Sequence, residues 1–208
     1  MYHFLFYFSL FFIYSLLGWI VEVIFTSIRN SKITFRGFLI GPYLPIYGFA
    51  SLLMIMALDK FKDNILAFFI MASLTAASLE YITSYIMEKL FKIRWWDYSE
   101  KKYHLDGRIC LSNTILFGVL GLMVIYFINP NITSFLYALN SDLLIVVSSI
   151  LLVLLIFDNI ISYVIISNLK LNLKRKDATE QVDEAVWNSL SRLAKRVLNA
   201  FPNYKFND

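Results

Sequence analysis

The chain has 208 residues, of which 59% are hydrophobic and 16% are charged, and its formal net charge is +4. A soluble domain of this size is about half apolar and about a quarter charged, so the composition argues against a soluble globular protein. A single cysteine excludes a disulfide within the chain, and two histidines give no cluster with metal-site spacing. We therefore expect no metal and no cofactor.

Long apolar segments follow one another along the chain and are predicted to be membrane-spanning helices. About 20 apolar residues are needed to cross the hydrocarbon core of a bilayer. The segments cover residues 4–28, 41–58, 65–91, 109–128 and 143–169. The second segment is short and opens with proline, which a first helical turn tolerates. The pattern predicts an all-α integral membrane protein with about five transmembrane helices within residues 1–169.

The basic residues are distributed unevenly between the connections of this predicted bundle. All but two of the 19 lysines and arginines lie in the first loop, the third loop or the tail. Basic loops remain on the cytoplasmic side of a membrane. We therefore predict a multi-pass protein of the cytoplasmic membrane, with its N-terminus outside and its C-terminus in the cytoplasm.

The last part of the chain, residues 170–208, is predicted to be a cytoplasmic amphipathic tail. Apolar residues recur at helical spacing within 177–201, with acidic residues near the start and basic residues near the end. This charge order suits the helix dipole. Two interpretations remain open, a helix lying on the inner leaflet and a helix that docks a cytoplasmic partner.

Glutamates inside apolar segments are candidate functional groups, because an ionisable side chain at mid-membrane costs about 2.5–3.5 kcal/mol. Glu80, Ser84 and Glu88 share one face of the third segment at i, i+4 and i+8 spacing. Glu22 lies near the inner end of the first segment. These acids form either a binding or proton-coupled site, or pairs with arginine that only fix the packing of the helices.

Arginine and glycine precede the second and fourth segments, with Arg36 before Gly41 and Pro42, and with Arg108 before the fourth segment. Backbone N–H groups at a helix start, the positive end of the dipole and a guanidinium together favour an anion. Gly37 and Gly41 also have G-x-x-x-G spacing, which equally indicates close helix packing.

The third loop contains Arg94, Trp95, Trp96 and Asp97 in succession. Paired tryptophans beside arginine at a helix end are typical of an interfacial belt. The alternative is a re-entrant cap over a cytoplasmic cavity, in which a tryptophan stacks on a ligand and Asp97 orients an arginine.

Several stretches carry a family resemblance when taken together. They are YSLLGWIVE (14–22), RGFLIGPYLPIYG (36–48), LEY (79–81), ME (87–88), RWWDYS (94–99) and GRICL (107–111). In these stretches the chain resembles the putative ABC-transporter type IV permeases, also called the CmpB family. The resemblance implies a permease component, and it adds Tyr47 to the candidate residues. The sequence has no Walker P-loop, so an ATPase would be a separate polypeptide.

Three functions are compatible with this pattern. The first is a transport component with a polar cavity at the cytoplasmic side, lined by buried glutamate and arginine. The second is a membrane-embedded enzyme or binder of anionic lipid headgroups, in which Arg36 and Arg108 hold phosphate and Glu22 or Glu88 acts as a general base. The third is an accessory or regulatory protein that recruits a cytoplasmic partner through its tail.

The candidate ligand-binding or coupling residues are common to these functions. They are Glu22, Arg36, Gly41, Pro42, Tyr47, Glu80, Glu88, Arg94, Trp95, Trp96, Asp97 and Arg108. The expected partners are the lipid bilayer, a separate ATPase subunit or another cytoplasmic protein, and a second copy of the chain. We expect no nucleic-acid partner.

Overall fold

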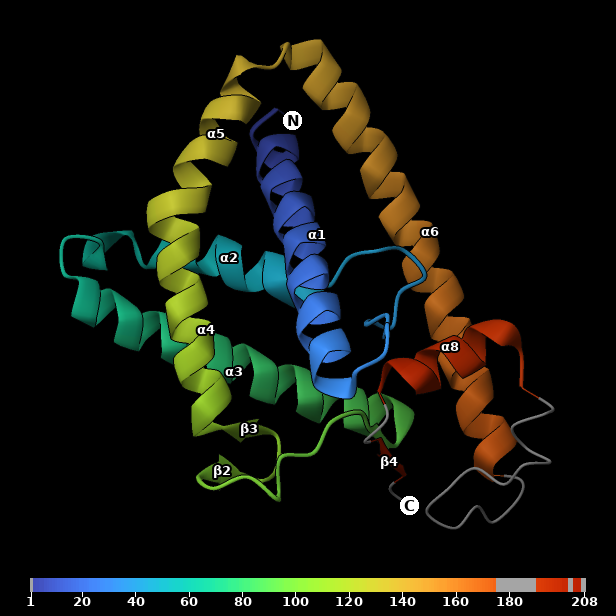
Figure 1. The fold of residues 1–208 in the computed structure, drawn as a ribbon. Helices are drawn as coiled ribbons and strands as arrows, with labels where there is room; N and C mark the ends of the chain where they lie inside the picture. The colour runs from blue at the N-terminus through green and yellow to red at the C-terminus, as the bar shows by residue number, and fades with distance from the viewer. Residues whose placement is uncertain (1, 175–189, 202–203, 207–208) are drawn as a thin grey trace.

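The computed structural model describes residues 2–174, 190–201 and 204–206, and most of this chain is helical (Figure 1). The α-helices are α1 (Tyr2–Asn30), α2 (Pro45–Ala57), α3 (Ile65–Phe91), α4 (Leu111–Met123), α5 (Asn129–Ala138), α6 (Ser141–Lys174) and α8 (Arg192–Ala200). A 3-10 turn, η1 (Asp59–Phe61), follows α2, and a π-helical turn, η2 (Val124–Ile128), joins α4 to α5. Two short antiparallel pairs join β1 (Ile93–Arg94) to β4 (Lys205–Phe206), and β2 (His104–Leu105) to β3 (Ile109–Cys110).

Four helical stretches of the described chain are long and apolar enough to cross a membrane. They are Tyr2–Asn30, Ile65–Phe91, Leu111–Ala138 and Ser141–Asn168. Large apolar side chains such as Phe25, Leu74 and Phe157 are exposed on their outer faces, as contact with lipid requires. The protein is therefore a membrane-embedded, multi-pass helical protein.

Two predicted segments differ from the observed helices. The helix α2 begins at Pro45 rather than at Gly41, and its 13 residues span only about 20 Å at 1.5 Å per residue. The stretch 129–138, expected to be a loop, is the helix α5. Pro130 lies in its first turn, where a missing N–H is tolerated, and apolar residues continue the helical pattern beyond it.

The helices contact one another closely at small residues. In Figure 1, α1, the α4–α5 stretch and α6 run in roughly the same direction, while α2 and α3 run across them. Gly48 of α2 lies against α1, where an added Cβ would approach the carbonyl oxygen of Phe11 to 2.6 Å. Gly118 of α4 lies against Ser73 of α3 in the same way. Small residues at such contacts allow two helix backbones to approach closely.

The helix α8 buries its apolar face in the protein itself. Val197, Leu198 and Phe201 pack in one cluster with Ile93 and Trp95. The guanidinium of Arg196 donates to the carbonyl oxygen of Leu39 at 2.9 Å, and that of Arg36 donates to the carbonyl oxygen of Ala200.

This packing bears on the predicted tail helix over 177–201, of which residues 177–189 lie outside the described chain. The described part of the tail occupies the space beside β1 and α6. Neither of the two open interpretations, a lipid-bound helix or a partner-docking helix, included this contact with the protein itself.

Candidate functional site

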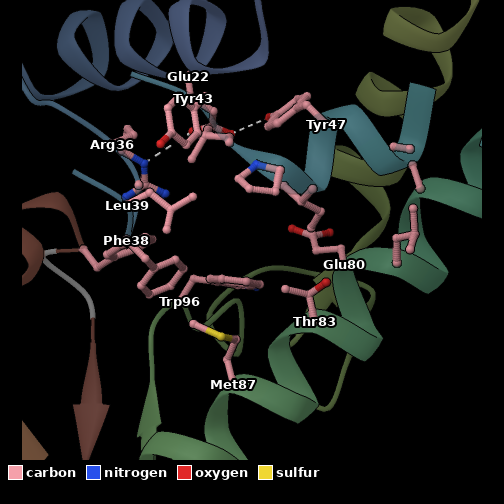
Figure 2. Close-up of a pocket in the computed structure, with 18 of the residues that line it drawn as sticks. Glu22, Arg36, Phe38, Leu39, Tyr43, Tyr47, Glu80, Thr83, Met87 and Trp96 are labelled. Carbon is pink, nitrogen blue, oxygen red and sulfur yellow. Dashed lines mark hydrogen bonds and ion pairs between the residues drawn. The ribbon is translucent and has the colours of Figure 1, made fainter. Parts of the chain in front are cut away.

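A cavity of about 290 Å³ lies where α1, α2 and α3 meet the segments 31–44 and 92–103 (Figure 2). Its lining is mostly apolar and aromatic, and it includes Glu22, Arg36 and Glu80. Small-molecule sites have volumes of roughly 300–1,000 Å³ and combine apolar walls with a few polar groups. The cavity is therefore close to the lower end of the size range for a small ligand.

Glu22, near the end of α1, has both carboxylate oxygens occupied. The Tyr47 hydroxyl donates to Oε1 at 2.7 Å, and Nε of Arg36 lies 3.4 Å from Oε2. The indole of Trp19 donates to the backbone carbonyl of Arg36 at 3.0 Å, which fixes the segment that carries this arginine. The charge of Glu22 is therefore balanced inside the cavity wall.

Glu80, in the middle of α3, is different because only one of its oxygens is occupied. Its side chain is buried, with 6% exposure, and the Tyr98 hydroxyl donates to Oε1 at 3.1 Å. Oε2 is buried and has no hydrogen-bond partner among the described residues. Figure 2 shows the carboxyl group directed into the cavity, on the opposite side from Arg36.

The partner of Glu80 is held in its protonated form. Burial raises the pKa of the Tyr98 hydroxyl well above its usual value, and the charge of Glu80 raises it further. Tyr98 therefore acts as a hydrogen-bond donor to Glu80 and does not compete with it as an anion. One acceptor oxygen of Glu80 is left for another donor.

Glu88, about two helical turns beyond Glu80 on α3, belongs to a separate network. Nε of Arg94 lies 3.0 Å and Nη1 of Arg108 lies 2.8 Å from Glu88 Oε2. Arg108 also donates to the Ser84 hydroxyl at 3.1 Å. The two arginines offset the charge of Glu88 beside the cavity and join the third loop to α3.

The predicted anion site at Gly41 and Pro42 is occupied by the protein's own carboxylate. The backbone N–H groups of Ile40 and Gly41 each donate to Asp158 of α6 at 2.8 Å, and the Tyr43 hydroxyl donates to the same carboxylate. The segment 38–42 bends beside this carboxylate without forming a helical turn, and α2 begins only at Pro45.

The two neighbouring tryptophans have different environments. Trp96 lines the cavity, and its indole N–H donates to the carbonyl oxygen of Arg108 at 3.0 Å. Trp95 is buried in the cluster with Phe38 and Phe201. Asp97 accepts hydrogen bonds from Ser99, and its Oδ1 lies 4.0 Å from Nη1 of Arg94.

Only some of the candidate residues predicted from the sequence line the cavity. Those that line the cavity are Glu22, Arg36, Tyr47, Glu80 and Trp96. Sequence reasoning missed Tyr98 and Phe201, which line the cavity, and Asp158, which holds the segment that carries Arg36. Asp158 carried a usable signal, since it is an acid within an apolar segment, just as Glu80 is. The contribution of Phe201 depends on the folding of the tail and has no local signal.

Comparison with known proteins identifies the family to which the chain belongs. The family model described as Putative ABC-transporter type IV (ABC_trans_CmpB) matches residues 9–163. The chain belongs to this family. The matched region of this CmpB-family chain contains every cavity-lining residue except Phe201. The resemblance seen in the sequence is thereby confirmed. No curated protein and no solved structure matches the chain significantly.

Proposed function

We propose that the protein is the permease component of a membrane transport system, and that the cavity is its solute-binding site. The observation that carries this proposal is the buried Oε2 of Glu80, which faces a ligand-sized space without a partner among the described residues. Family membership supports a transport-related role. In this proposal the protein has five spanning segments in the cytoplasmic membrane, and the cavity opens toward the cytoplasm.

A purely structural role accounts poorly for Glu80. The neighbouring acids Glu22 and Glu88 are each paired with arginine, as expected for acids that fix the packing of helices. Leaving a polar atom buried without a hydrogen bond costs about 1–3 kcal/mol. Such a cost is expected where a ligand supplies the missing contact.

The two other functions have less support from the geometry. Binding of an anionic headgroup needs free guanidinium groups, but Arg36 contacts Glu22 and Arg108 contacts Glu88. Recruitment of a partner through the tail needs an open apolar face, but the described part of α8 buries that face against β1 and Trp95. A separate ATPase subunit would supply the energy for transport.

The test is transport by the full-length protein in proteoliposomes, together with any ATPase that co-purifies with it. Uptake from a defined mixture of solutes would be followed by mass spectrometry. Glu80→Gln removes the charge, and Ala50→Trp fills the cavity that Ala50 lines. Glu100→Gln makes the same chemical change as Glu80→Gln at an exposed loop position and serves as the control.

We expect the wild-type protein and Glu100→Gln to accumulate at least one solute, and the two cavity variants to lose that accumulation. Equal transport by Ala50→Trp and the wild-type protein would remove the cavity from the pathway. Normal transport by Glu80→Gln alone would remove Glu80 from the mechanism. Thermal unfolding of each variant separates a transport defect from loss of fold.

A further inference from the structure

One acceptor of the cavity, Oε2 of Glu80, is left without a donor among the described residues. The hydroxyl groups of Tyr47 and Tyr98 donate to Glu22 and Glu80, respectively. Arg36 lies against Glu22 and also donates to the carbonyl oxygen of Ala200. These tyrosine and arginine groups are thus engaged with other acceptors, while Oε2 of Glu80 has no donor among the described residues.

The charged residues of the described lining also leave Glu80 without a cationic partner. Among the lining residues that the structure describes, the ionisable acids and bases are Glu22, Glu80 and Arg36. Arg36 neutralises Glu22 at 3.4 Å. When Glu80 is ionised, one negative charge is left facing a space with mostly apolar walls, and a cationic partner would stabilise that charge.

The walls fit the apolar part of an organic molecule. Phe38, Trp96, Phe117 and Phe201 are all part of the lining. Figure 2 shows Trp96 and Glu80 bordering the same space. An ammonium group is attracted both by a carboxylate, through a charge-assisted hydrogen bond, and by aromatic faces, of which indole is the best.

We propose that the cavity binds a small organic cation, a protonated amine with an apolar or aromatic group. Its ammonium group donates to Oε2 of Glu80, and its apolar part lies against Trp96 and Phe38. This inference names the substrate class of the site and rests on the transport function proposed above. An inorganic divalent cation fits less well, because the described residues contain no group of three or more potential metal ligands.

Three matched probes test the ligand class: 2-phenylethylammonium, the neutral 2-phenylethanol and the anionic 3-phenylpropanoate. The full-length protein would be placed in lipid nanodiscs at pH 7, and binding would be measured by calorimetry. We expect the cation to bind about tenfold or more tightly than the alcohol, since a hydrogen bond to a charged group is worth about 1.5–3 kcal/mol. The anion should bind most weakly.

The same titrations with variants locate the contact. Glu80→Gln should abolish the preference for the cation over the alcohol, and Trp96→Leu should weaken binding of both probes. Glu100→Gln should bind as the wild-type protein does. Because the wild-type series needs no variant, the proposal stays testable if Glu80→Gln fails to fold.

The outcomes separate this inference from the transport function. Equal or tighter binding of the alcohol or the anion, or binding of none of the three probes, would overturn the assignment of an organic cation. Cavity-dependent transport of another solute would then still support the permease function. Selective binding of the cation without any transport would instead leave the ligand class standing and remove the permease function.

Discussion

The carboxylate of Asp158 on α6 accepts a hydrogen bond of 2.8 Å from the backbone N–H of Gly41, across 117 positions of sequence. The N–H group of Ile40 donates to the same carboxylate. This contact fixes the segment between α1 and α2, which carries Arg36 and Phe38 into the cavity wall. An acid on the last long helix therefore shapes a site to which its own side chain does not contribute.

Replacing Asp158 should loosen this segment. In Asp158→Asn the amide can accept from one backbone N–H group but directs its own N–H₂ group toward another donor. We expect a loss of about 2–3 kcal/mol in the free energy of unfolding, because hydrogen bonds to a charged group contribute about 1.5–3 kcal/mol. Unfolding in detergent would measure the loss. The exposed Asp142→Asn at the start of α6 should be nearly neutral.

The contact between Glu88 and Arg108 should behave as a coupled pair. Removing Arg108, which is buried, leaves Glu88 with Arg94, and breaking a buried pair costs about 3–5 kcal/mol. We expect Arg108→Ala and Glu88→Ala each to be strongly destabilising, and the double variant to lose less than the sum of both. A double-mutant cycle on unfolding free energies would measure this coupling. Additive losses would show that the two side chains are not energetically coupled.

Gly48 and Gly121 provide a matched comparison of helix contacts. A Cβ at Gly48 would meet the backbone oxygen of Phe11 at 2.6 Å, while one at Gly121 would meet the Cβ of Ala72 at 3.0 Å. Gly48→Ala should therefore lower the free energy of unfolding by about 1–3 kcal/mol, and Gly121→Ala by less. The reverse order would contradict the packing of α1 against α2.

The orientation of the chain in the membrane can be tested with single cysteines. Cys110 is the only cysteine and is buried, so Cys110→Ser provides the background for His3→Cys, Asp63→Cys and Glu100→Cys at exposed positions. An impermeant maleimide should label the first two from outside the cell and Glu100→Cys only after permeabilisation. Labelling of Asp63→Cys only after permeabilisation would mean that α2 does not span the membrane.

Labelling of Glu100→Cys from outside would contradict the predicted orientation. The loop that contributes Trp96 and Tyr98 to the cavity would then lie on the external side. The proposed opening of the cavity toward the cytoplasm would be lost with it.

The helical membrane fold could be predicted because it depends on composition and on the length of apolar runs. The positions of α1 and α3 follow directly from these runs. The boundaries of α2 and α5 could not be predicted in this way. The segment before α2 is bonded to Asp158, which is remote in sequence, and α5 follows a π-helical turn with Pro130 in its own first turn.

The site was predictable only in part, for a similar reason. Glu22 and Glu80 were found because each is an acid within an apolar segment, and Arg36 because it precedes a predicted helix start. Local sequence could not indicate which acid would find an arginine. Glu22 and Glu88 are both paired, whereas Glu80 is not, and this difference arises only from the three-dimensional arrangement of the loops.

Phe201 belongs both to the cluster that holds α8 and to the lining of the cavity. A version of the protein shortened before Arg192 would lack the Phe201 side chain in the cavity wall. Its ligand affinities would therefore refer to a wider cavity that is more accessible to water. Quantitative binding work should therefore retain residues 192–201.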